Sequence, residues 1–232
     1  MIVLDSLVTG YSGDRSRAFR SKPFSASLEA GKVTCLVGRN GAGKSTLLRT
    51  MAGIQNPVSG NVYYSCGDER FDMFSVSRRR LASTVSIVLT SVSGIEGLTA
   101  YDVVSMGRIP FTGILGSMTE KDRDAVDSAV SLTGTGAFVS RPFDSLSDGE
   151  RQKVMIAKSV AQQTPVILLD EPSAFLDYPS RVELMDMLHG LAHEHGKTIL
   201  LSSHDLDMVK KTADSFWILS ADGLQVTQEL TL

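Results

Sequence analysis

Residues 38–46 read Gly38-Arg39-Asn40-Gly41-Ala42-Gly43-Lys44-Ser45-Thr46 and match the phosphate-loop pattern G-x-x-x-x-G-K-[ST] in full. Glycines in such a loop let backbone N–H groups turn inward around phosphate oxygens, because no Cβ stands in the way. Lys44 can reach the β- and γ-phosphates, and the hydroxyl of Ser45 can hold Mg²⁺. The stretch therefore predicts a site for a nucleoside triphosphate and Mg²⁺, with residues 38–46 as its phosphate-binding part.

The segments on either side have the order that this loop needs. Residues 32–37 are predicted to form a strand, and Lys44–Met51 a helix whose N-terminus faces the bound anion. The alternative is a glycine-rich turn that matches by chance, and the strand–loop–helix context disfavours it.

The composition limits the class of protein. The chain has 232 residues, of which 42% are hydrophobic, which is enough for one large domain with a buried core. The net charge of −3 gives no reason to expect a nucleic acid partner. Two cysteines predict no disulfide framework, and no apolar run has the length of a membrane span. Without a visible signal peptide, we expect a cytoplasmic protein.

Strand-like and helix-like segments alternate along the chain, which is typical of an α/β fold. The apolar runs 34–37, Val166–Leu169 and 198–201 are expected to be central parallel strands, because they have no polar face. Antiparallel strands are expected at Ile2–Val8, 18–28 and 61–66, and in a closing hairpin of 216–219 and 224–227.

The pattern becomes helical between residues 91 and 163, with helices predicted over 100–107, Glu120–Leu132 and 149–163. We therefore expect a single domain over residues 1–232. In it, residues 1–90 and 164–232 form the α/β core with an antiparallel β subdomain, and residues 91–163 form an inserted helical subdomain.

Two carboxylates follow the predicted strand Val166–Leu169. A buried strand would deliver Asp170 and Glu171 at its carboxyl end, where open α/β sheets bind ligands. Adjacent carboxylates repel each other unless a cation or different roles separate them. We assign Asp170 to the Mg²⁺ shell and Glu171 to the polarisation of an attacking water. The alternative is a strand that ends in two solvated acids.

A second helix start has the chemistry of a phosphate site. Ser147 is predicted to be an N-cap, with Glu150 completing a capping box. The Ser147 hydroxyl and the N–H of Gly149 at a helix N-terminus also suit a phosphate. Two phosphate-binding helix starts in one chain suggest a composite site between two copies.

The motifs together resemble those of a known family, the ATP-binding subunits of ABC transporters. They occur in the family's order over nearly the whole chain. The resemblance implies a P-loop NTPase (RecA-like) mixed sheet core with an antiparallel β subdomain and an inserted α-helical subdomain. Besides the phosphate loop, the matching segments are 146–152 (similar to the LSGGQ signature), 170–177 (Walker B and D-loop), 202–205 (switch histidine) and Tyr11, where the family has an aromatic that stacks on adenine.

This resemblance also implies roles for single residues. Glu171 is expected to activate water, with His204 and Lys44 as further catalytic residues. Contacts with ATP are expected from the phosphate loop together with Tyr11, Ser147, Gly149 and Asp177. Ser45 and Asp170 are expected to hold Mg²⁺.

Residues 106–113 are similar to a GR-x-P segment of the ATPases that power iron–siderophore, haem and cobalamin importers. This similarity implies a homodimer that closes on ATP and works with integral membrane permease subunits, and indirectly with a substrate-binding protein. The expected location is the inner face of the cell membrane.

One position departs from the family pattern. The family has a Mg²⁺-contacting glutamine at the junction into the helical insertion, whereas residues 87–91 contain none. Thr90 is the nearest candidate, and its shorter hydroxyl would reach the metal through a water. Other interpretations remain open at this point: a soluble ABC ATPase without transport, an exporter subunit, or a small P-loop kinase or GTPase, against which the signature segment argues.

Overall fold

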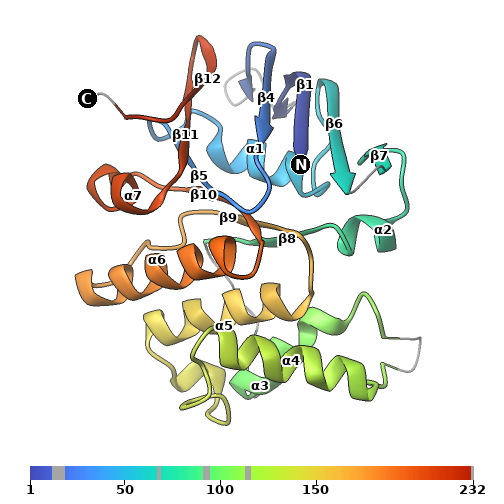
Figure 1. Ribbon diagram of the computed structural model, residues 1–232, viewed down its shortest axis with the longest axis vertical. Coiled ribbons are helices and arrows are strands. Elements are labelled where there is room, and N and C mark those ends of the chain that lie inside the picture. Colours follow the sequence, from blue (N-terminus) through green and yellow to red (C-terminus); the bar gives the residue numbers. More distant parts are fainter. Residues whose placement is uncertain (12–18, 67–68, 91–94, 113–115, 231–232) are drawn as a thin grey trace.

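The computed structural model describes residues 1–11, 19–66, 69–90, 95–112 and 116–230 (Figure 1). These ranges contain a six-stranded sheet of order β12-β11-β5-β10-β9-β8, a four-stranded sheet of order β4-β1-β6-β7, and the pair β2-β3. The strands are β1 (Ile2–Val8), β2 (Gly10–Tyr11), β3 (Phe19–Arg20), β4 (Phe24–Leu28), β5 (Val33–Val37), β6 (Ser59–Cys66), β7 (Glu69–Asp72), β8 (Val85–Val88), β9 (Val166–Leu169), β10 (Thr198–Ser202), β11 (Ser215–Ser220) and β12 (Gly223–Thr227). The helices are α1 (Lys44–Met51), α2 (Arg78–Ala82), α3 (Ala100–Ser105), η1 (Met106–Arg108), α4 (Glu120–Leu132), η2 (Phe143–Ser145), α5 (Asp148–Ala161), α6 (Tyr178–His193) and α7 (Leu206–Thr212).

The six-stranded sheet is parallel from β8 to β11, and β12 runs antiparallel to β11. Every residue of β5, β9 and β10 is buried, so these strands contribute to a core on each face. Along β9, Ile167 and Leu169 belong to the core formed with α3 to α7, while Val166 and Leu168 belong to the core formed with α1 and the four-stranded sheet. The predicted central parallel strands are therefore confirmed, as is the mixed α/β fold.

Helices α3, α4 and α5 lie together at one end of the molecule, and the four-stranded antiparallel sheet lies at the other (Figure 1). Helix α5 contacts α3, α4 and strand β8. Its buried residues belong to the same core as Ile167 and Leu169 of β9; they include Val154, Ile156, Ala157 and Val160. The helical group is thus attached to the sheet through α5.

Some predicted bounds are wrong. The single strand expected over 18–28 is two strands, because β3 pairs with β2 whereas β4 pairs with β1, and Pro23 between them has no N–H to donate. Ala18 lies outside the described residues, as does Gly113. The helix expected over 100–107 ends at Ser105 and continues as η1, and the helix expected over 149–163 spans Asp148–Ala161.

Strand β8 was not predicted, because a serine stands in the middle of its four residues. Ser86 is buried, and its hydroxyl lies within hydrogen-bonding distance of the Ser159 hydroxyl and accepts a bond from Thr164 Oγ1 at 2.9 Å. A buried hydroxyl is tolerated when it has such partners. The strand therefore depends on partners about eighty residues away, which a local pattern does not contain.

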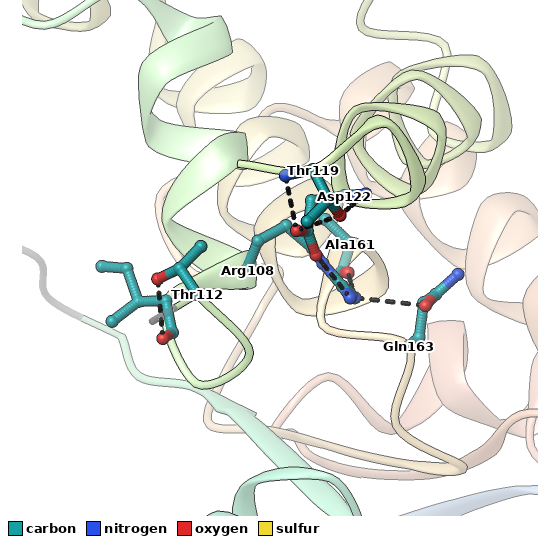
Figure 2. Close-up of polar contacts among 7 residues, drawn as sticks. Arg108, Thr112, Thr119, Asp122, Ala161 and Gln163 are labelled. Carbon is teal, nitrogen blue, oxygen red and sulfur yellow. Dashed lines mark hydrogen bonds and ion pairs between the residues drawn. The ribbon is translucent and has the colours of Figure 1, made fainter. Parts of the chain in front are cut away.

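A buried ion pair joins three parts of the helical group (Figure 2). Arg108 in η1 donates from Nε to Oδ1 of Asp122 in α4 at 3.0 Å. Its Nη1 donates to the carbonyl of Ala161, the last residue of α5, at 2.7 Å and to the side chain of Gln163 at 3.1 Å. The other oxygen of Asp122 accepts bonds from the hydroxyl and the N–H of Thr119. The charged groups of Arg108 and Asp122 therefore have hydrogen-bond partners that offset the free-energy cost of removing them from water.

We expect Asp122→Ala to lower the free energy of unfolding by about 3–5 kcal/mol, because it leaves the Arg108 charge buried without its partner. The matched control is Asp124→Ala, which removes an exposed carboxylate from the same helix. Chemical denaturation of the two variants and the wild type measures the difference. Equal stability of the two variants would contradict the role given to the pair.

The same carboxylate should make stability depend on pH. The Thr119 hydroxyl, the Thr119 N–H and the Arg108 charge hold the pKa of Asp122 below its usual value. A carboxyl whose folded-state pKa is lowered contributes stability above its unfolded pKa, and this contribution is lost as the pH falls through the folded pKa. Thermal unfolding between neutral and acidic pH should therefore show a weaker acid destabilisation in Asp122→Asn than in the wild type.

Candidate nucleotide-binding and catalytic site

The phosphate loop connects the buried strand β5 to helix α1 at the carboxyl end of the parallel strands. Gly41 and Gly43 have φ values of 81° and 99°, a left-handed backbone that glycine adopts without strain. Gly43 is also the N-cap of α1, and no side chain caps this helix in the part of the chain that the structure describes. The first N–H groups of α1 are thus left for an anion.

Lys44 places a buried positive charge at the centre of this loop. Its side chain is 6% exposed, and its Nζ donates to the carbonyl of Gly38 at 2.9 Å. The same Nζ is 3.9 Å from Oε1 of Glu171. A buried ammonium group needs such oxygen partners, and phosphate oxygens are equally suited to it.

The two carboxylates after β9 are held by Ser202 from the neighbouring strand β10. The Ser202 hydroxyl donates to Oδ1 of Asp170 at 2.8 Å and accepts the N–H of Glu171 at 2.8 Å. Ser202 is completely buried, and Asp170 nearly so. Sequence reasoning missed Ser202. Its only signal is the parallel register, which pairs Leu201 with Leu169 and so sets Ser202 beside Asp170.

His204 follows β10 and approaches Glu171 from the adjacent strand. Its Nδ1 is 3.6 Å from Oε1 of Glu171, and 64% of its side chain is exposed. The chain after it is fixed by Asp205, which caps α7 and accepts a bond from Arg181 at 3.0 Å. Glu171 is thus bracketed by Lys44 and His204, two groups that stabilise negative charge when protonated.

Of the residues just described, Lys44 and Glu171 line a pocket of about 380 Å³, whereas Asp170, Ser202 and His204 lie outside its lining. Gly38, Arg39 and Ala42 belong to the loop but not to the lining: the carbonyl of Arg39 accepts the N–H of Ala42 at 3.1 Å and so closes the turn. Phe19 also lines the pocket, although the sequence did not predict it as a site residue. The lining comprises Tyr11, Phe19, Asn40, Gly41, Gly43, Lys44, Ser45, Thr46 and Glu171.

Thr90 lies just after β8, beside Asp170 and outside this lining. Its Oγ1 donates to the backbone carbonyl of Asp170 at 2.8 Å. It also borders a second cavity of about 240 Å³, whose walls include Phe143 and Met155 from the helical group. Thr90 therefore stands at the junction between the sheet and the helices, and its contact with a metal stays a prediction.

Ser147, Gly149 and Asp177 do not line the 380 Å³ pocket of their own chain. Ser147 caps α5, accepting the N–H of Glu150 at 3.3 Å, while the Glu150 carboxylate accepts the N–H of Ser147 at 2.9 Å. That N–H is the main cause of the lowered pKa of Glu150. Asp177 caps α6 and accepts the N–H of Ser180 at 3.0 Å. The capping box is confirmed, but one chain does not gather all the predicted nucleotide contacts.

The oxygen donors near the loop fit Mg²⁺ by their chemistry. Ser45 offers a hydroxyl and Asp170 a carboxylate, and Mg²⁺ prefers such hard oxygen ligands completed by phosphate and water. The bond from Ser202 to one oxygen of Asp170 orients the carboxylate. Among the described residues, no three His, Cys, Asp or Glu side chains converge on one point, so an all-protein metal cage is not formed there.

Comparison with known proteins agrees with these features. A family model described as ABC transporter matches residues 21–174. The achromobactin transport ATP-binding protein CbrD of Dickeya dadantii is 41% identical over 187 residues, which are 81% of this chain and 68% of that protein. The iron(3+)-hydroxamate import ATP-binding protein FhuC of Bacillus subtilis is 38% identical over 181 residues, 78% of this chain and 66% of that protein. The matched part is thus about two thirds of these relatives' length.

The fold has close counterparts among solved structures. A dimeric structure of MJ0796, a bacterial ABC transporter cassette, superposes with a TM-score of 0.83 at 22% identity and covers 100% of both chains. This likeness confirms the expected P-loop NTPase fold. With the complete phosphate loop, the carboxylates after β9 and the matched family model, the chain belongs to the ABC transporter family of ATP-binding proteins.

Proposed function

We propose that this chain is the ATP-binding and ATP-hydrolysing subunit of an ABC importer. The observation that carries the proposal is the position of Glu171, which lines the phosphate-loop pocket together with Lys44 and has His204 Nδ1 3.6 Å from its Oε1. Among the described residues of that lining, Glu171 is the only carboxylate, which makes it the candidate base for a water that attacks the γ-phosphate. The names of the two relatives above, both ATP-binding proteins of transport systems, support the proposal.

In this proposal each residue has a separate task. Glu171 orients and activates the water, and Lys44 and His204 stabilise negative charge that develops during phosphoryl transfer. Tyr11 stacks on the adenine. Ser45 and Asp170 would hold Mg²⁺, with Thr90 reaching it through a water, and bound Mg²⁺ neutralises the charge of the β- and γ-phosphates.

A second copy of the chain completes the site. Ser147 and Gly149 lie at the start of α5 and are absent from the pocket of their own chain, so their contact with a nucleotide needs another protomer. Two copies that close head to tail would place each Ser147 helix start, and Asp177 near it, on the ATP of the other copy. ATP binding then favours closure and hydrolysis releases it, moving the helical segment of residues 91–163.

The relatives support a proposal for the transported solute and for the partners. We propose an iron–siderophore, haem or cobalamin type of solute, supported by the relatives named for achromobactin transport and iron(3+)-hydroxamate import. Integral membrane permease subunits would be direct partners and a substrate-binding protein an indirect one, at the inner face of the cell membrane. None of the helices in the described ranges has the length and apolar character needed to cross a membrane.

Glu171→Gln should lower the rate of ATP hydrolysis by about 10²–10⁴-fold, because the amide keeps the shape of the side chain but cannot act as a base. ATP affinity should be retained. Phosphate release and equilibrium ATP binding measure the two effects separately, with the exposed Glu29→Gln as the matched control. Hydrolysis within a few-fold of the wild type would contradict the role of Glu171.

Ser147→Arg should block hydrolysis, because its bulk and charge keep α5 away from the partner's ATP. Lys44→Ala should block it by removing the phosphate contact. Mixing the two inactive variants should restore about a quarter of the wild-type rate, since random pairing makes half of the dimers mixed, each with one intact site. The control is Ser131→Arg on the exposed face of α4. No recovery on mixing would refute the composite site.

A further inference from the structure

The residue that sequence reasoning missed in the pocket, Phe19, has no role in the mechanism above. It lies on the short ribbon β2-β3, where Phe19 pairs directly with Tyr11 and Arg20 with Gly10. Residues directly opposite in an antiparallel pair project from the same face. The two rings are accordingly neighbours, with centroids 6.1 Å apart and planes tilted by 33°.

The ring of Phe19 rests directly on the phosphate loop. A Cβ added at Gly43 would overlap Cζ of Phe19, so only glycine lets this ring reach the loop. The ribbon is held in place independently: a Cβ at Gly10 would overlap the carbonyl of Phe19, and the Gln55 side chain after α1 donates to the carbonyl of Gly10. The position of Phe19 over the loop is thus fixed by close packing at Gly10 and Gly43 and by the hydrogen bond from Gln55.

The pocket lining therefore combines two kinds of group. Phosphate-binding groups, including Lys44 and Ser45, come from the loop and the start of α1, and the aromatic rings come from the β2-β3 ribbon. Tyr11 is the outer ring, with 51% of its surface exposed, and Phe19 is the ring in contact with the loop. In a nucleotide the ribose lies between the phosphates and the base, so a triphosphate on the loop brings its nucleoside part across Phe19 before it reaches Tyr11.

We infer that Phe19 is a second aromatic contact for the nucleoside, and that Phe19 and Tyr11 together form one surface that a purine spans. This inference rests on the proposed function, because it concerns the same pocket. A bicyclic base overlaps both rings, whereas a pyrimidine overlaps less of the pair, and stacking strength follows the overlapping area. Purine nucleotides are therefore preferred over pyrimidine nucleotides, without discrimination between ATP and GTP.

The test compares three probes by calorimetric titration of the full chain: MgATP, MgCTP and magnesium tripolyphosphate, which has no nucleoside. Phe19→Ala should weaken MgATP binding by about five- to 150-fold, the range expected for loss of one base–aromatic stack. It should leave tripolyphosphate binding unchanged and reduce the preference for MgATP over MgCTP. Phe19→Trp should restore MgATP binding. This variant keeps an aromatic ring at position 19, so it separates loss of the ring from misfolding of the alanine variant.

The matched control is Phe71→Ala, which truncates a partly buried ring on β7 away from this pocket. Equal weakening of MgATP and tripolyphosphate would overturn the inference, because Phe19 would then only support the loop. Tighter binding of both would overturn it too, because the ring would then block the loop.

The proposed function and the inference fail in different ways. If the wild type binds neither MgATP nor tripolyphosphate, the proposed function itself fails. Suppose instead that the wild type binds MgATP and tripolyphosphate and that Lys44→Ala binds neither ligand. If Phe19→Ala then binds both ligands as the wild type does, only the role of Phe19 is refuted.

Discussion

The backbone pairing of three buried parallel strands, β5, β10 and β9, is the constraint on which the rest of the molecule depends. Every residue of these strands is buried, so their N–H and C=O groups must find partners in the neighbouring strands. A slip of one residue would exchange the side chains of the two cores that the strands separate. Because the register is fixed, the segments that leave the carboxyl ends of these strands meet at one edge of the sheet.

Much of this architecture can be predicted from the sequence wherever the signal is local. Helices α1 and α4 begin and end at the predicted residues, since a glycine loop starts one and a Thr119–Asp122 capping box starts the other. The apolar runs of β9 and β10 and the phosphate loop are equally evident from short stretches of chain. Where several neighbouring residues favour the same local structure, contacts with distant parts of the chain seldom change it.

The features that could not be predicted depend on neighbours distant in sequence. Ser86 sits in a buried strand because Ser159 and Thr164 satisfy its hydroxyl, and Ser202 organises Asp170 only through the register of two strands. Phe19 reaches the pocket because Gly43, on another element, leaves room for its ring. In each case the residue type alone does not indicate a role. The role depends on a contact with a residue distant in sequence, which a local pattern does not contain.

The backbone of Glu171 has a consequence for how this chain can be engineered. Its φ is 49°, a left-handed conformation that costs a non-glycine residue about 1–2 kcal/mol. The Ser202 hydroxyl on its N–H and the N–H of Ala174 on its carbonyl hold it there. A search for heat-resistant variants would accordingly select glycine or asparagine at this position, and each would remove the carboxylate. Under the proposed role of Glu171, stability and turnover would be opposed at this single residue, and selection for stability alone would produce a protein that binds nucleotide without hydrolysing it.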